Sequence, residues 1–218
     1  INHRSPQWSM RIASTVNGVE YAAYGYKGRW TTPVGSYSSG DLTGLLYFPQ
    51  LRTYGASARL PLANGIFNAE FSVYNSIEDR DGNKPNIAND QSKLLLGYEQ
   101  ELVKNLTGSV QFYLEHTRQY HQYINNVLFE NTASEQNRQV TTLRLTHRAM
   151  QQKLSTSLFV FYSPSDNDAY LKPSIQYRHN DNWQYSVGAN LFYGDKDHTF
   201  FGQHQQNSNA WLRITYNY

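Results

Sequence analysis

Apolar and polar residues alternate with a period of two along most of this chain. In 183–193, Trp, Tyr, Val, Ala and Leu take the odd positions, while Gln, Ser, Gly and Asn take the even positions up to 190. This alternation is typical of a strand with one apolar and one polar face. Eleven segments fit the pattern: 7–15, 19–30, 51–62, 66–79, 94–102, 106–116, 138–150, 154–162, 169–179, 183–193 and 208–218. None has the period of an amphipathic helix, so the sequence predicts an all-β chain.

The connections between these segments alternate between short and long. The short ones are 16–18, 63–65, 103–105, 151–152 and 181–182, and the first two contain Asn-Gly pairs that suit positive φ. The long polar links are 31–50, 80–91, 121–137, 163–168 and 195–207. Short turns at one end and long loops at the other are typical of outer-membrane barrels, whose short turns are periplasmic. We therefore predict that 1–218 form one domain, a transmembrane antiparallel up-and-down β-barrel. A soluble β-sandwich is the alternative.

Composition agrees with a barrel and excludes other classes. No run of 18 apolar residues occurs, so the sequence predicts no transmembrane helix. Barrel strands need only about 9–11 residues, half of them facing inward, so the mean hydropathy of −0.68 does not exclude a membrane. The 18 Tyr fit interfacial girdles, and the absence of Cys fits an oxidising envelope. A net charge of +2 argues against a nucleic-acid partner.

The end of the chain carries a resemblance to a known group. Counting back from the terminal aromatic residue, apolar residues occupy alternate positions: Tyr218, Tyr216, Ile214 and Leu212. This pattern resembles the C-terminal assembly signal of bacterial outer-membrane proteins, which usually ends in Phe. Short motifs at 95–99, 161–166 and 199–203 also look like a group of uncharacterised, porin-like Gram-negative outer-membrane proteins. The resemblance implies a β-barrel in the outer membrane, surrounded by its lipid and inserted by the barrel-assembly machinery.

Eleven strands do not close a barrel of this kind. The first and last segments run in the same direction, whereas bacterial single-chain barrels have even, antiparallel strand counts. We therefore expect twelve or more strands. The chain begins at Ile1 without a signal-peptide pattern, so we read it as mature or as lacking an N-terminal portion. Other sources of a further strand are a partner chain and the stretch 30–50, in which 44–48 resembles part of a strand.

Charged residues on the predicted polar face fall into two sectors. Three segments between 66 and 116 carry the acidic residues Glu70, Glu99, Glu101 and Glu115, with Lys93 as the exception. Three segments beyond 138 carry the basic residues Arg144, Arg148, Lys172, Arg178 and Arg213. We expect these sectors to face each other across a water-filled pore, where opposed charges create a transverse field. The alternative is a closed interior filled by salt-bridged pairs.

Candidates for catalysis or metal binding lie in the long links. Asp195, Asp197, His198 and His204 occupy one of them, and 79–83 contains two Asp residues. Such residues can activate water or bind Ca²⁺, but 79–83 lacks the rest of an EF-hand loop, and solvated loop polarity explains both sets. The Ser-Pro-Ser-Asp run at 163–166 is a turn signal and not a nucleophile elbow. We predict no catalytic residue, metal or cofactor.

These observations favour a porin-like channel for the passive diffusion of small polar solutes or ions. Reversing Arg144 and Arg178 to Glu would then shift ion selectivity toward cations. Two alternatives stay open: a structural barrel that anchors or sheathes a partner protein of an electron-transfer, export or surface complex, and an outer-membrane hydrolase. The link 121–137 is more apolar than an exposed loop should be, so we expect it to fold into the pore or to dock on a partner.

Overall fold

The predicted strands are present in the computed structural model. It describes residues 6–38, 41–126 and 133–218, with the backbone alone for 35–38 and 41–45. The eleven predicted strands are confirmed, with shifted ends. They are β1 (Trp8–Val16), β2 (Val19–Arg29), β5 (Gln50–Leu62), β6 (Gly65–Ser76), β7 (Gln91–Val103), β8 (Leu106–Thr117), β9 (Asn137–Ala149), β10 (Leu154–Ser163), β11 (Asp168–Arg178), β12 (Trp183–Gly194) and β13 (Asn209–Tyr216).

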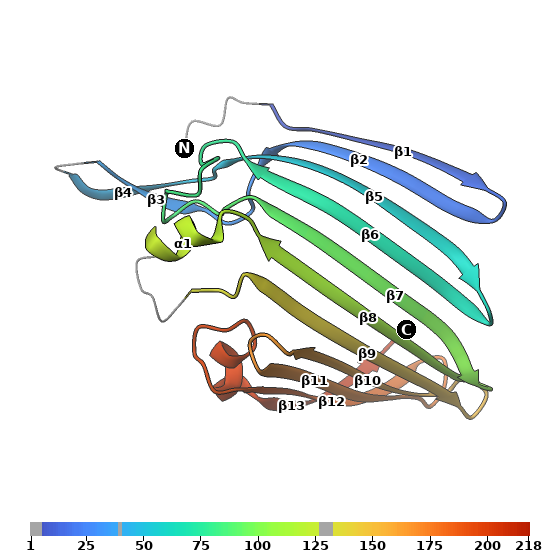
Figure 1. Ribbon diagram of the computed structural model, residues 1–218. Helices are drawn as coiled ribbons and strands as arrows, with labels where there is room; N and C mark the ends of the chain where they lie inside the picture. The colour runs from blue at the N-terminus through green and yellow to red at the C-terminus, as the bar shows by residue number, and fades with distance from the viewer. Residues whose placement is uncertain (1–5, 39–40, 127–132) are drawn as a thin grey trace. The chain divides into compact units, whose positions relative to one another are not determined.

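These strands form one antiparallel up-and-down sheet in the order β1-β2-β5-β6-β7-β8-β9-β10-β11-β12-β13 (Figure 1). The sheet is not closed by the described strands, because β1 and β13 end the order without pairing with each other. The stretch 30–50 does contain strands, β3 (Val34–Ser38) and β4 (Asp41–Tyr47), but they form a separate two-stranded sheet. They therefore do not supply the expected twelfth strand, which stays a prediction.

The chain divides into two compact units. Unit 1 comprises 1–59, 69–94 and 115–137, and unit 2 comprises 60–68, 95–114 and 138–218. Strands β5 to β8 contribute residues to both units, while β9 to β13 lie almost wholly in unit 2. The single domain that the sequence predicts therefore stays a prediction.

The strand register in unit 2 separates the two faces of the sheet. Residues directly opposite each other on paired strands point to the same face. One row across β9 to β13 is polar: Arg148, Ser155, Gln176, Ser186 and Arg213. The adjacent row is mostly apolar: His147, Thr156, Ile175, Val187 and Leu212. The alternation read from the sequence therefore sorts side chains onto opposite faces, as predicted.

Unit 1 shows the same separation across β1, β2 and β5. One pair of rows is apolar or small: Met10, Gly25 and Tyr54, then Ile12, Ala23 and Ala56. The rows that alternate with these are more polar: Ser9, Tyr26 and Thr53, then Arg11, Tyr24 and Gly55. Both units thus have an apolar face, and on it large side chains such as Ile12 (63% exposed) and Leu212 (71% exposed) are uncovered by any described element.

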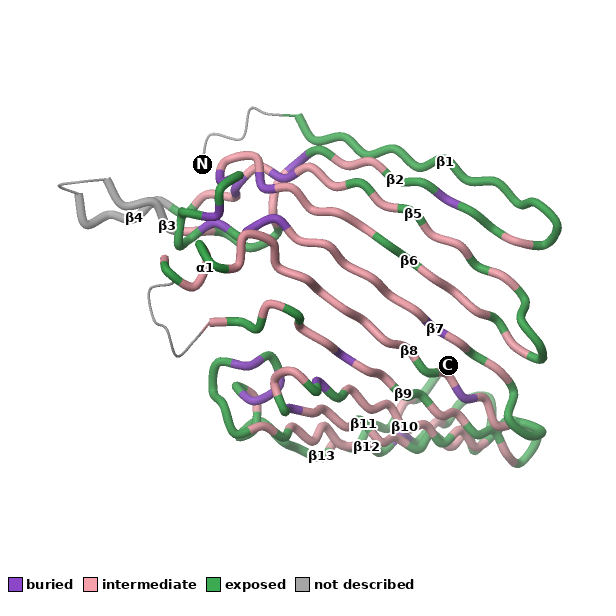
Figure 2. Tube along the Cα trace, viewed as in Figure 1, coloured by how far each residue is buried: buried purple, intermediate pink, exposed green. Residues whose placement is uncertain are grey.

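Buried residues gather at the strand ends that carry the long loops (Figure 2). Among the most buried side chains are Pro49, Ser76, Ser163 and Asp168, each at or beside such an end. The described parts of the loops contain two short helices, α1 (Tyr120–Asn126) and the 3-10 helix η2 (Gly202–Asn207). Within the described residues, no helix has the length and apolar character needed to cross a membrane.

The short turns use positive φ only partly as predicted. Asn17 and Gly18 have φ of 51° and 78°, which confirms the first Asn-Gly prediction. In the second turn the positive φ falls on Ala63 (51°), the residue before the Asn-Gly pair. That turn therefore uses a different geometry to join β5 to β6, although both connections are equally short.

Candidate functional site

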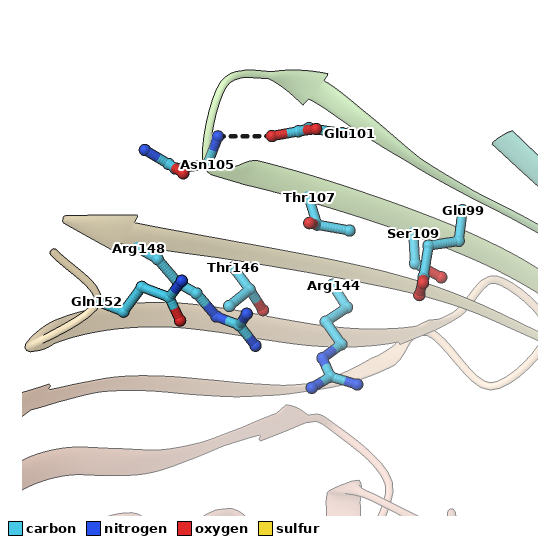
Figure 3. Close-up of a pocket in the computed structure, with 9 residues that line it drawn as sticks. All are labelled: Glu99, Glu101, Asn105, Thr107, Ser109, Arg144, Thr146, Arg148 and Gln152. Carbon is cyan, nitrogen blue, oxygen red and sulfur yellow. Dashed lines mark hydrogen bonds between the residues drawn. The ribbon is translucent and has the colours of Figure 1, made fainter. Parts of the chain in front are cut away.

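A hollow of about 370 Å³ lies on the polar face of β7, β8 and β9, within unit 2 (Figure 3). Its lining is entirely charged or polar: Glu99, Glu101, Asn105, Thr107, Ser109, Arg144, Thr146, Arg148 and Gln152. Because side chains alternate along a strand, residues two apart share a face. β7 therefore contributes two carboxylates, β8 two hydroxyls, and β9 two guanidinium groups with a hydroxyl between them. The short turns after β7 and β9 contribute the two amides.

The opposite charges in this hollow are not paired with each other. Glu101 Oε1 accepts a hydrogen bond from the Asn105 backbone N–H at 2.7 Å. In the part of the chain that the structure describes, no ion pair within 4.0 Å joins Arg144 or Arg148 to Glu99 or Glu101. Figure 3 shows both guanidinium groups extending away from the glutamates. The two kinds of charge are thus left to interact with solvent or with a bound solute.

The hollow brings together four of the nine charged residues predicted to line a pore. The carboxylates on β7 and the guanidinium groups on β9 are separated in the sheet order by the single strand β8. For these four residues, the acidic and basic groups are therefore neighbours on one wall and do not face each other across a gap. The sequence predicted the face of each residue, but not this adjacency.

The other predicted basic residues share the polar face of unit 2 without lining the hollow. Lys172 is aligned with Arg144 through Phe159, and Arg213 lies in the same row as Arg148. Arg178 is two positions from Gln176 on β11 and so points to the same face. This basic face extends over β9, β11 and β13.

The other two predicted acidic residues lie in unit 1 and so outside the hollow. Glu115 Oε2 is 3.0 Å from Lys93 Nζ, which in turn lies 4.3 Å from the centre of the Tyr74 ring. Lys93, the one basic residue in the predicted acidic sector, thus neutralises Glu115. Glu70 lies on β6, and its negative charge acts on the Tyr24 hydroxyl, which is 3.0 Å from Ser57 Oγ.

The residues considered for catalysis have structural contacts or lie apart. Asp79 is buried, and its carboxylate accepts the backbone N–H groups of Asn83 and Lys84 at 3.0 and 2.9 Å, which shapes the loop 79–84. His204 lies on η2 against Phe192, with ring centres 5.5 Å apart. Nowhere in the described residues do three His, Cys, Asp or Glu residues gather in a way that could hold a metal ion. The turn predicted at 163–166 is confirmed, with the Ser163 hydroxyl donating to Gln139 O at 2.8 Å.

The link 195–207 packs on the polar face of unit 2, a contact that the sequence did not predict. The Phe201 ring lies 5.6 Å from Phe161 and 6.0 Å from Tyr170, and Asp168 Oδ2 accepts the Phe201 N–H at 2.7 Å. A Cβ on Gly202 would lie 2.3 Å from Lys196 O, so only glycine fits this loop. The adjacent Phe-Phe-Gly at 200–202 was the available signal. The link expected to fold inward was 121–137, of which 127–132 lie outside the described residues.

Comparison with known proteins adds no relative to these observations. No protein-family model matches the chain, and no curated protein matches it either. The resemblance to outer-membrane barrels is therefore carried by the motifs of the chain itself.

Proposed function

We propose that this chain is the membrane-spanning part of a Gram-negative outer-membrane β-barrel that works as a porin-like channel for small polar solutes or ions. The observation that carries this proposal is the exposed apolar face of the sheet. Residues such as Met10, Ile12, Val187, Leu212 and Ile214 are 47–71% exposed on it. Burying one such side chain is worth about 1.5–3 kcal/mol, and no second described sheet of comparable size covers this face. Lipid hydrocarbon is a cover that suits every strand at once.

The polar face supports a channel more than a filled interior. A closed interior requires its charges to be paired, because an unpaired buried charge is costly. Glu99 and Glu101 carry no ion pair to Arg144 and Arg148 within the described residues, although all four line one hollow. Water in a lumen would solvate these groups, and their fields would act on passing ions.

The proposal requires strands beyond those described. In hydrocarbon, every backbone N–H and C=O must be hydrogen bonded, so a barrel cannot leave an open sheet edge. β1 and β13 each present such an edge. We propose that at least one further strand, from the same protein or from a partner chain, joins them.

The test is single-channel conductance of the detergent-purified protein in a planar bilayer, with the reversal potential under a salt gradient. Folding is checked first by the heat-dependent shift in gel mobility that barrels show. Stable conductance steps are the expected result. A folded barrel without conductance would contradict the channel and favour the alternative, a barrel that anchors or sheathes a partner protein.

A further inference from the structure

A second charged hollow, of about 320 Å³, lies in unit 1 at the long-loop end of β5 and β6. Arg52, Arg80 and Arg118 are among the residues that line it, together with Tyr54, Asn75 and Asp90. Lys27 is directly opposite Arg52 on β2. We call Lys27, Arg52, Arg80 and Arg118 the basic cluster.

The strand residues of this cluster lie on the apolar face of the sheet. Lys27 and Arg52 form one row with Trp8. Because side chains alternate, this row shares its face with the row of Met10 and Tyr54, two positions further along. The hollow of Glu99 and Arg144 lies on the polar face instead, so the two sites serve different surroundings.

The positive charge of the cluster is mostly uncompensated. Among the described residues that line the hollow, Asp90 is the only acidic one, and its carboxylate is already engaged. Its Oδ1 accepts the Ser76 backbone N–H at 2.7 Å, and its Oδ2 is 3.7 Å from Arg118 Nη2. In the described part of the chain, Lys27, Arg52 and Arg80 have no ion pair with a carboxylate. Three cations are therefore left without an anionic partner.

Cations on a lipid-facing surface are tolerated only near the membrane interface, where anionic headgroups lie. The exposed Tyr54 ring is on the same face, as expected of an interfacial aromatic residue. Below it, Met10 and Ile12 offer an apolar surface to acyl chains. Guanidinium groups bind phosphate oxygens through paired, charge-assisted hydrogen bonds.

We propose that the basic cluster binds the phosphate of an anionic lipid headgroup, with the acyl chains of that lipid lying along the apolar face. This inference rests on the proposed function, because it requires the apolar face to be in a membrane. A free phosphate would satisfy the guanidinium groups alone. A lipid satisfies both the cluster and the apolar surface that continues from it, so lipid is the source to which the structure points.

The register of Trp8 with Lys27 provides a local probe. The protein is reconstituted in phosphatidylcholine vesicles that contain a small fraction of either brominated phosphatidic acid or brominated phosphatidylcholine. Bromine quenches tryptophan fluorescence at short range, and the W8F variant identifies the part of the signal that comes from Trp8. The ratio of quenching by the two lipids gives the preference for the phosphate headgroup.

We expect the wild-type protein to prefer phosphatidic acid. In R52Q/R80Q the preference ratio should fall about fivefold for each charge removed. The matched control is R11Q/R59Q, which removes the same charge from the polar face of unit 1 and should keep the preference. An unchanged preference in R52Q/R80Q, or an equal loss in the control, would overturn the inference. So would complete competition by millimolar inorganic phosphate, because that result identifies a soluble anion as the ligand.

Flotation of the vesicles separates this inference from the proposed function. A chain that inserts, shifts in gel mobility on heating and yet shows no headgroup preference overturns the lipid site alone. A chain that does not float with the vesicles overturns the barrel, and the lipid site with it. The conductance of R52Q/R80Q should match that of the wild-type protein, because Arg52 lies on the apolar face and Arg80 lines the same hollow.

Discussion

The Lys93 ammonium and the Glu115 carboxylate lie 3.0 Å apart, on neighbouring strands and on the polar face of the sheet. Both side chains are mostly shielded from solvent, with 20% and 17% of their surfaces exposed. The pair contrasts with the hollow on β7 to β9, where carboxylates and guanidinium groups line one space without pairing. Charge on the polar face is thus neutralised in the Lys93–Glu115 pair and left unpaired in the hollow. Only the unpaired charges of the hollow should influence a passing ion.

The available charges predict the ion selectivity of the proposed channel. R144E/R148E should shift the reversal potential toward cation selectivity, and E99Q/E101Q should shift it toward anion selectivity. Each charge contributes roughly 1 kcal/mol to the energy of an ion a few ångströms away in a water-filled lumen. R178E should cause a smaller shift, because Arg178 shares the polar face but does not line the hollow.

The Lys93–Glu115 pair supplies the control for this prediction. K93Q/E115Q removes one charge of each sign from a pair that is already neutral, so the reversal potential should not move. An equal shift in K93Q/E115Q and R144E/R148E would show that selectivity does not arise in the hollow.

A second prediction concerns Asp168, which holds the link 195–207 on the polar face. Its Oδ2 accepts the backbone N–H groups of Phe201 and Gly202 at 2.7 and 3.3 Å, and its side chain is buried. D168A leaves both donors without an acceptor, at a cost of about 1–3 kcal/mol in the stability of the loop. Hydrogen exchange at the Phe201 amide should accelerate accordingly.

D168N is the matched variant, because its amide oxygen can still accept both hydrogen bonds. Exchange at Phe201 in D168N should lie between the wild-type and D168A rates. If D168A exchanges no faster than the wild-type protein, the loop is held by its aromatic contacts, and Asp168 does not anchor it.

The strands were predictable because each places alternate side chains on two chemically different faces of the sheet. The row of His147, Ile175, Val187 and Leu212 shows how alternation on single strands adds up to one apolar surface. The polar face of Arg144 and Arg148 followed from the same parity. Their position beside Glu99 did not follow, because parity says nothing about which residues of non-adjacent strands share a hollow.

The loops were less predictable because long-range contacts determine their structure. Helix η2 is held by the Asp168 carboxylate, which accepts the backbone N–H of Phe201, 33 positions later in the sequence. Helix α1 has seven residues, too few for a periodic signal. The strand β4 was anticipated only at 44–48, and its partner β3 was not anticipated at all. No local pattern specifies contacts of this kind.

A third prediction uses Tyr120 on α1 as a pH probe outside the predicted membrane strands. Burial, followed by the negative charge of Glu135, raises the pKa of the Tyr120 phenol above its ordinary value of 10.0. Its hydroxyl donates to Ser134 O at 3.0 Å, which joins α1 to the residues before β9. In the unfolded loop the phenol ionises at its ordinary pKa. The stabilisation is therefore complete below that pH and is lost as pH rises through the higher pKa of the folded state.

Tyrosinate absorbance during an alkaline titration measures this pKa. The difference between the wild-type and Y120F curves should be centred above 10.0, the ordinary value. E135Q removes a neighbouring negative charge and should move the centre downward. A difference curve centred at or below the ordinary value would contradict the shielding of Tyr120.

The last prediction concerns the C-terminal residues that resemble an assembly signal. Tyr218 is fully exposed beyond the end of β13, and Leu212, Ile214 and Tyr216 are exposed on the same face of that strand. An exposed edge strand with alternating apolar side chains is available to pair with a strand of an assembly factor. Y218A should therefore lower the fraction of protein that becomes a heat-modifiable barrel in the outer membrane several-fold, without changing the stability of molecules that do fold.

Two further variants make this prediction specific to the aromatic ring. Y218F matches the residue with which the signal usually ends, so it should assemble at least as well as the wild-type protein. N217A changes the neighbouring side chain of opposite parity, while the backbone N–H of residue 217 still donates to Asn182 O at 2.8 Å. It should assemble normally. If N217A and Y218A lose assembly equally, the loss does not depend on the aromatic ring, and Tyr218 is not a recognition signal.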